Sequence, residues 1–234
     1  MASEVMFTVL RIDNTKSARN MIYTKKTILN SVSHWLMLFV LLFTTTTAWA
    51  ADVSGTINVS SLADNAELKL TGATTLNIDV DKTIKSIRGD YTLTIQGSKT
   101  LTINNSNGDG IAVGTLVSSA KLNITASKAG LNINNDIRVM GGSLDVNAGS
   151  DGIYSDEGKI EINCNTVVKS SGGRAIYAQG DISLAGNLTA ETTAAKKECI
   201  RAGYAKDSGF TISSISIIGT TIEVTSVSRS MNND

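Results

Sequence analysis

Three acidic residues combine ligand chemistry with a turn-forming setting that suits a metal ion. Asp109 and Asp151 each precede a glycine at matching positions of a repeated pattern, and Asp156 follows shortly after the second of them. Calcium takes about six to eight oxygen ligands from carboxylates and carbonyls, and glycine-rich turns expose carbonyl groups. These three residues are therefore candidate calcium ligands. An aspartate before glycine can also serve only to stabilise a turn, and the sequence leaves both interpretations open.

Two tyrosines have the side chains and the spacing to contact a sugar. Tyr154 and Tyr177 each follow the isoleucine of an Ile-Tyr pair, so they occupy the same position in consecutive repeats. Stacked strands lie about 4.8 Å apart. Two outward-facing rings would then form a short ladder on which a sugar ring can stack. The alternative is that the rings stabilise only each other, as neighbouring side chains on a sheet do.

Arg174 and Asn132 are further candidate sugar ligands, through a guanidinium and an amide. A guanidinium can hold the carboxylate of an acidic sugar in a bidentate fork. The basic residues can equally belong to an ordinary ion-paired sheet surface. Arg138, for example, is predicted to lie opposite Glu161 on adjacent strands.

The first fifty residues have the composition of an export signal. Lys25 and Lys26 precede an apolar run over residues 35–43, and Ala48-Trp49-Ala50 places small residues where a signal peptidase cleaves. The apolar run is about nine residues long, whereas a membrane span needs about twenty. We therefore expect residues 1–50 to be an N-terminal extension and secretory signal, with the true start at Met21 and cleavage after Ala50. The alternative is a short buried helix.

Removal of that segment limits the chemistry of what remains. The only histidine, His34, leaves with it, which excludes Ser-His-Asp and Cys-His catalysis and most zinc sites. Residues 51–234 keep 16 basic and 19 acidic side chains. With this composition the chain lacks the cluster of positive side chains that binding to nucleic acid requires. The sequence therefore predicts a secreted or cell-surface protein, exported by the general secretory route, with no nucleic-acid partner and no membrane insertion. It leaves the oligomeric state open.

Within residues 51–234, a repeat of a small residue followed by a large aliphatic residue recurs between residues 110 and 200, and upstream the strand pattern continues with a looser count. Between its copies lie strands of three or four residues that alternate apolar and polar side chains. Strands this short are stable only when they stack coil on coil. No proline occurs in the chain, and proline would remove a donor from a strand ladder. We predict an all-β fold, a right-handed single-stranded parallel β-helix with about 20–24 residues per coil. The copies are Gly110-Ile111, Gly130-Leu131, Gly152-Ile153, Ala175-Ile176 and Cys199-Ile200.

Two further expectations concern the cysteines and the end of the chain. Cys164 and Cys199 occupy different positions in the repeat, which favours buried free thiols over a bridge. The strand pattern continues over residues 212–227, close to the last residue of the sequence. An uncapped solenoid end exposes a pairing edge, so the β-helix domain is either truncated at the C-terminus or covered there by another chain.

The recurring Gly-Ile or Ala-Ile step resembles a family of secreted bacterial β-helix proteins described as carbohydrate-binding domain-containing. The likeness is clearest in Ser150-Asp151-Gly152-Ile153 and in Ile160-Glu161-Ile162 after it, and covers roughly residues 85–225. The family is similar in fold to pectate lyases. The resemblance implies binding of polysaccharides, acidic plant glycans among them, with calcium as a structural or bridging ion. Ala129 and Arg174 depart from the family pattern and would interrupt a metal row.

These observations favour a non-catalytic, secreted protein that docks an extended polysaccharide on the outer face of the β-helix. One alternative is a structural or adhesin-like spacer at the cell surface, whose repeats supply only length. Another is a calcium-dependent polysaccharide lyase. The only set that could serve its chemistry is Asp151, Asp156 and Arg174.

Overall fold

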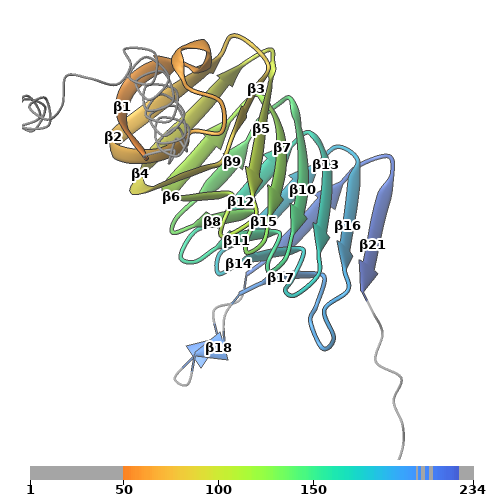
Figure 1. Ribbon diagram of the computed structural model, residues 1–234. Helices are drawn as coiled ribbons and strands as arrows, with labels where there is room; N and C mark the ends of the chain where they lie inside the picture. The colour runs from red at the N-terminus through yellow and green to blue at the C-terminus, as the bar shows by residue number, and fades with distance from the viewer. Residues whose placement is uncertain (1–49, 204, 207–208, 211–212, 227–234) are drawn as a thin grey trace, which may run out of the picture. The chain divides into compact units, whose positions relative to one another are not determined.

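The computed structural model describes residues 50–203, 205–206, 209–210 and 213–226. The predicted export signal lies outside the described residues, apart from Ala50. The fold is all-β, a parallel solenoid of about seven turns, so the predicted fold class is confirmed. Figure 1 shows the coils stacked one on the next.

The alternation of side chains explains why the chain forms strands. In β10 (Ser143–Ala148), Leu144, Val146 and Ala148 are buried, while Asp145 and Asn147 are exposed. A strand places successive side chains on opposite faces, so such a segment has one face for the core and one for solvent. The strands above and below it supply its backbone partners.

A twelve-stranded sheet covers two sides of each coil. It divides at β6, whose first residues pair with β8 and whose last residues pair with β9. One branch continues through β11, β14 and β17, and the other through β12, β15 and β20. The long strands are β1 (Ala51–Asn58), β2 (Glu67–Ile78), β4 (Ser86–Gly97) and β6 (Ile111–Ser118). The first branch holds β8 (Leu131–Ile133), β11 (Ile153–Ser155), β14 (Ile176–Ala178) and β17 (Ile200–Ala202), and the second β9 (Ile137–Val139), β12 (Ile160–Asn163), β15 (Ile182–Ala185) and β20 (Ile215–Ile218).

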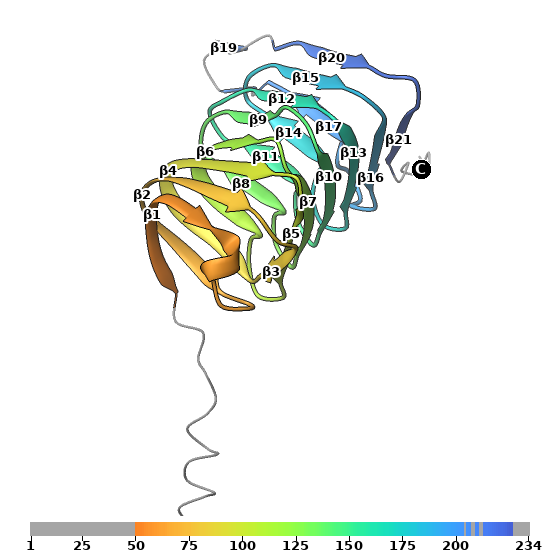
Figure 2. The same ribbon diagram turned by 90° about the horizontal axis from the view of Figure 1, so that it is seen from above.

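A seven-stranded parallel sheet forms the third side, as the view in Figure 2 shows. A short 3-10 helix, η1 (Val59–Ser61), follows β1. Along the chain, a two-stranded antiparallel pair comes after β17 and before β20. No helix in the described part of the chain is long and apolar enough to cross a bilayer. The seven strands are β3 (Lys82–Ile84), β5 (Thr100–Asn105), β7 (Lys121–Ala126), β10, β13 (Asn165–Ser170), β16 (Leu188–Thr192) and β21 (Ile222–Ser226), and the antiparallel pair is β18 (Ala205–Lys206) with β19 (Gly209–Phe210).

The core is a set of aliphatic columns along the solenoid axis. The strand register aligns the five aliphatics of the predicted repeat, at intervals of 20, 22, 23 and 24 residues. The first four of them are fully buried. The predicted repeat is therefore confirmed, as is the pairing of Glu161 with Arg138, whose side chains lie 3.2 Å apart. Cys164 and Cys199 are buried free thiols, as predicted.

Candidate functional site

One row of outward side chains runs along the first branch of the large sheet. Each member follows an inward aliphatic residue, so the backbone ladder holds the row in register from coil to coil. Because coils are roughly 4.8 Å apart, its members form a continuous surface parallel to the solenoid axis. We call it the outer row: Arg88, Ala112, Asn132, Tyr154, Tyr177 and Arg201.

The two tyrosines of the outer row stack, as predicted. Their ring centroids are 5.3 Å apart, with 26° between the planes. Their exposure differs, however, because Tyr154 is partly exposed whereas Tyr177 is only 5% exposed. The guanidinium carbon of Arg174 lies 4.9 Å from the Tyr177 ring centroid. Tyr154 is therefore the ring that a ligand can reach, and Tyr177 supports it from the next coil.

Tyr154 is also held in position through its hydroxyl. The O–H donates a hydrogen bond to Asp156 Oδ1 at 2.7 Å. Burial raises the pKa of Tyr154, and the hydrogen bond to Asp156 and its negative charge raise it further. The phenol thus stays neutral at physiological pH. The contact also assigns a role to Asp156, which orients the ring.

A pocket of about 240 Å³ opens at the other end of the outer row. Glu67 pairs there with two cations, Lys85 at 3.1 Å and Arg88 at 2.9 Å. The Arg88 side chain is still 55% exposed. Lys128, also exposed, adds a third cation to the lining. The full lining is Glu67, Lys85, Ser86, Ile87, Arg88, Asn105, Asn107, Gly108, Asp109, Ala112 and Lys128.

Asp109 connects the pocket with the outer row. Its Oδ1 accepts the backbone N–H of Ala129 at 2.9 Å, and its Oδ2 accepts the side-chain amide of Asn132 at 3.1 Å. The amide of Asn132 is therefore oriented by a carboxylate one coil away. Asn132 and Asp109, which were predicted as separate sugar and metal ligands, form one polar contact.

The three predicted calcium ligands do not converge. Asp109 uses both oxygens within the protein, Asp151 accepts the backbone N–H of Arg174 at 2.6 Å, and Asp156 holds the Tyr154 hydroxyl. Asp109 and Asp151 each bridge two neighbouring coils. The predicted alternative to metal binding was that each stabilises only its own turn. Within the described ranges, no group of three or more His, Cys, Asp or Glu side chains is arranged to hold a metal ion. The donor set therefore does not fit a shared calcium ion.

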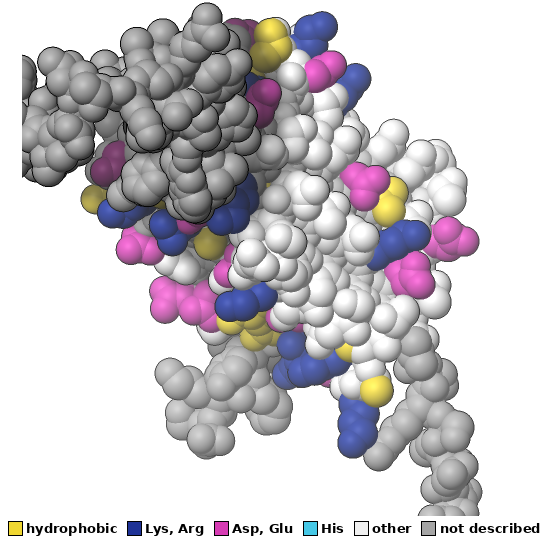
Figure 3. Space-filling model, viewed as in Figure 1, with side chains coloured by type: hydrophobic (Ala, Val, Ile, Leu, Met, Phe, Trp, Pro, Cys, Tyr) yellow, Lys and Arg dark blue, Asp and Glu magenta, His cyan; other side chains and the backbone are white. Residues whose placement is uncertain are grey.

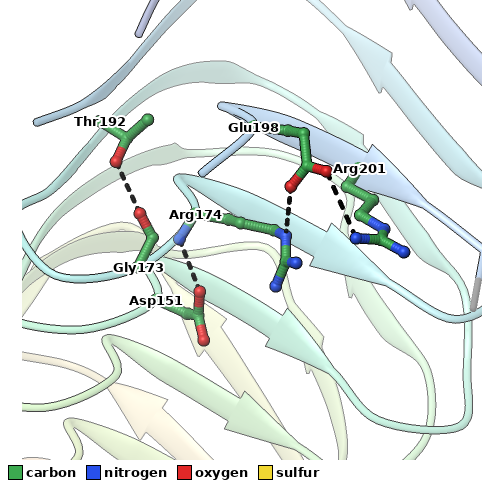
Figure 4. A network of polar contacts seen from close by, with 6 residues as sticks. All are labelled: Asp151, Gly173, Arg174, Thr192, Glu198 and Arg201. Atoms are coloured by element: carbon green, nitrogen blue, oxygen red, sulfur yellow. Dashed lines mark hydrogen bonds and ion pairs between the residues drawn. The ribbon is translucent and has the colours of Figure 1, made fainter. Parts of the chain in front are cut away.

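Arg174 belongs to an ion-pair network beside the tyrosines (Figure 4). Its Nε donates to Glu198 at 3.1 Å, and the other oxygen of Glu198 accepts Arg201 Nη1 at 3.3 Å. The pKa of Glu198 is lowered, first by a hydrogen bond from its own backbone and then by Arg174 and Arg201. Arg174 is thus engaged by a carboxylate of its own protein.

Apart from Asp109, the residues of the pocket were not predicted from the sequence. The signal that could have found Arg88 is its position after Ile87, the same position that Tyr154 holds after Ile153. Lys128 has no such signal, because it lies in a turn between β7 and β8. Charged side chains of both signs are interspersed on the face drawn in Figure 3.

A comparison of the sequence with protein families matches residues 42–234 to one described as "Carbohydrate-binding domain-containing protein". The match covers the whole of the described solenoid. The chain belongs to this family. No curated protein and no solved structure matches the chain significantly.

Membership in the carbohydrate-binding domain-containing family supports carbohydrate binding and suggests a non-catalytic role. Asp151, Asp156 and Arg174, the one set that the sequence offered for a lyase, each bond another group of the protein. The pocket and the partly exposed ring of Tyr154 lie along the outer row.

Proposed function

We propose that this carbohydrate-binding domain-containing protein is secreted and docks an extended, acidic polysaccharide along the outer row. One observation carries the proposal: the register places the charged pocket, the oriented amide of Asn132 and the accessible ring of Tyr154 on one line. Arg88 and Tyr154 lie three coils apart, or roughly 14 Å. A polymer that repeats along its length matches a protein surface that repeats in the same direction.

The residue types along this line suggest how the sugar lies. The face of Tyr154 offers an apolar surface for the C–H face of a sugar ring, and the amide of Asn132 can bond its hydroxyls. Arg88 and Lys128 supply the charge that favours a uronate or another acidic substituent. Glu67 already neutralises part of this charge, so we expect moderate affinity that weakens as salt concentration rises.

Titration calorimetry of the full chain with acidic oligogalacturonides and with neutral glucan oligosaccharides tests the proposal. We expect Tyr154→Ala to weaken binding of both kinds of ligand by roughly 2–10-fold, because it removes a stacking surface. Arg88→Gln should weaken binding of the acidic ligand alone, by roughly tenfold, because it removes a charged hydrogen-bond donor.

Two matched substitutions away from the outer row serve as controls. Tyr91 is 47% exposed, and Arg138 pairs with Glu161 on the other branch of the sheet. Tyr91→Ala and Arg138→Gln should leave the affinity unchanged. Equal losses in the controls would place the site elsewhere. The absence of binding to any oligosaccharide would instead favour a structural spacer.

A further inference from the structure

A second column of side chains lies at the corner that precedes the first branch of the sheet. Its members stand two residues before the inward aliphatics, and the strand register stacks them in consecutive coils. We call it the corner column: Asp109, Ala129, Asp151, Arg174 and Glu198.

Each aspartate of the corner column is bonded to the next member. Asp109 accepts the N–H of Ala129, and Asp151 accepts the N–H of Arg174. The first link ends at Ala129, which has no polar side chain. The second continues, because the guanidinium of Arg174 reaches forward to Glu198 (Figure 4).

Arg174 therefore contacts two carboxylates of the column, Asp151 through its backbone N–H and Glu198 through its guanidinium. Asp151 is one coil behind it and Glu198 one coil ahead, and the Arg174 side chain is only 18% exposed. Stacked carboxylates repel each other unless a cation lies among them. Calcium is the ordinary external cation for such oxygen-rich positions, and a guanidinium supplies the same charge from within the chain.

We infer that Arg174 is the resident cation of the corner column and takes the place that a divalent metal ion would otherwise fill. The coils from Asp151 to Glu198 then stack without calcium. A carboxylate in place of Arg174 would leave three acids in consecutive coils, roughly 4.8 Å apart, and would give this corner a calcium requirement.

Thermal unfolding of the full chain, followed by circular dichroism, tests the inference. The Tm of the unsubstituted protein should be the same in chelator as in about 10 mM calcium, a concentration above the dissociation constants of weak protein calcium sites. Arg174→Asp in chelator should lower the Tm by roughly 2–4 °C or more. Calcium should then restore at least about half of that loss, because an ion that binds only the folded state stabilises it by mass action.

Arg138→Asp is the matched control, because it makes the same change of charge beside Glu161 but outside the corner column. It should show no recovery with calcium. If R174D does not fold, Arg174→Asn supplies a neutral oxygen ligand and should show a smaller response of the same sign.

Two outcomes would overturn the inference. One is a Tm of the unsubstituted protein that falls in chelator and loses this sensitivity in Asp151→Asn, because a metal ion would then already occupy the corner. The other is a folded variant at position 174 whose Tm does not respond to calcium.

Discussion

Cys164 and Cys199 show how burial changes the chemistry of single residues in this protein. Both thiols lie in the packed interior, 9% and 6% exposed, and neither is bridged. Burial raises the pKa of both thiols, because it penalises the charged thiolate. The thiolate is the reactive form, so the folded protein should protect both cysteines.

We predict that a thiol reagent at about pH 8 reacts slowly with the native protein, because the thiols are neutral as well as buried. In denaturant both cysteines should react rapidly. A pKa that is higher in the folded state also means that stability is lost as pH rises above the ordinary thiol value of about 8.5. Replacement of both cysteines by alanine should reduce this alkaline loss, measured by urea unfolding at several pH values. Rapid native labelling would contradict the buried placement.

Strand packing depends on close contact between the two sheets at one corner. Gly110, Gly130 and Gly152 stack in consecutive coils immediately before the inward aliphatics. A Cβ atom at Gly130 would lie 2.2 Å from a methyl carbon of Val146 on the seven-stranded sheet. In a later coil, Ala175 stands at the position of Gly130 and Ala190 at the position of Val146. The corner residue is therefore larger where the residue that faces it is smaller.

This relation predicts a coupled pair. Gly130→Ala alone should destabilise the protein by about 1–3 kcal/mol through overpacking. The double variant with Gly130→Ala and Val146→Ala should lose less free energy of unfolding than the sum of the two single losses. We expect a coupling of about 0.5–3 kcal/mol. The coupling is measured by urea unfolding of the four proteins in the cycle. Val139 is another buried valine, and Val139→Ala should combine additively with Gly130→Ala. Additivity in both cycles would argue against the contact between position 130 and Val146.

Across the whole molecule, aspartates at the corners bind one coil to the next. Among the described residues, five aspartates each accept a backbone N–H from the following coil: Asp81 from Thr100, Asp109 from Ala129, Asp136 from Lys159, Asp151 from Arg174 and Asp181 from Ser214. For Asp181, the backbone N–H and then the hydroxyl of Ser214 lower the carboxyl pKa. Protonation in acid should therefore weaken the attachment of the last described coil.

The sign of the pH effect follows from this lowered pKa. The contribution of Asp181 is present above the ordinary aspartate value of about 3.9 and is lost as pH falls below it toward the folded-state value. We predict that Asp181→Ala accelerates hydrogen exchange in β20 at neutral pH and removes the part of the acid response that is specific to β20. Asp64→Ala, which removes the ion pair between the exposed Asp64 and Lys82 at 2.7 Å, should leave exchange in β20 unchanged. Unaltered exchange in D181A would contradict the role of this contact.

The residue pattern alone is enough to predict the coil, its period and its core. Small–aliphatic pairs and alternating strands recur along the chain, and this information is local and one-dimensional. It also aligned Tyr154 with Tyr177 and Arg138 with Glu161, because register in a solenoid follows from counting residues within each coil.

Three-dimensional packing sets which of the aligned side chains are accessible and which carboxylates are already bonded. Tyr154 and Tyr177 occupy equivalent positions, yet one ring is reachable and the other is covered. That difference depends on Arg174, which comes from a turn, and turns vary in length and direction from coil to coil. The pocket has the same origin, because Lys128 and Asp109 meet there from turns whose positions a strand pattern does not encode.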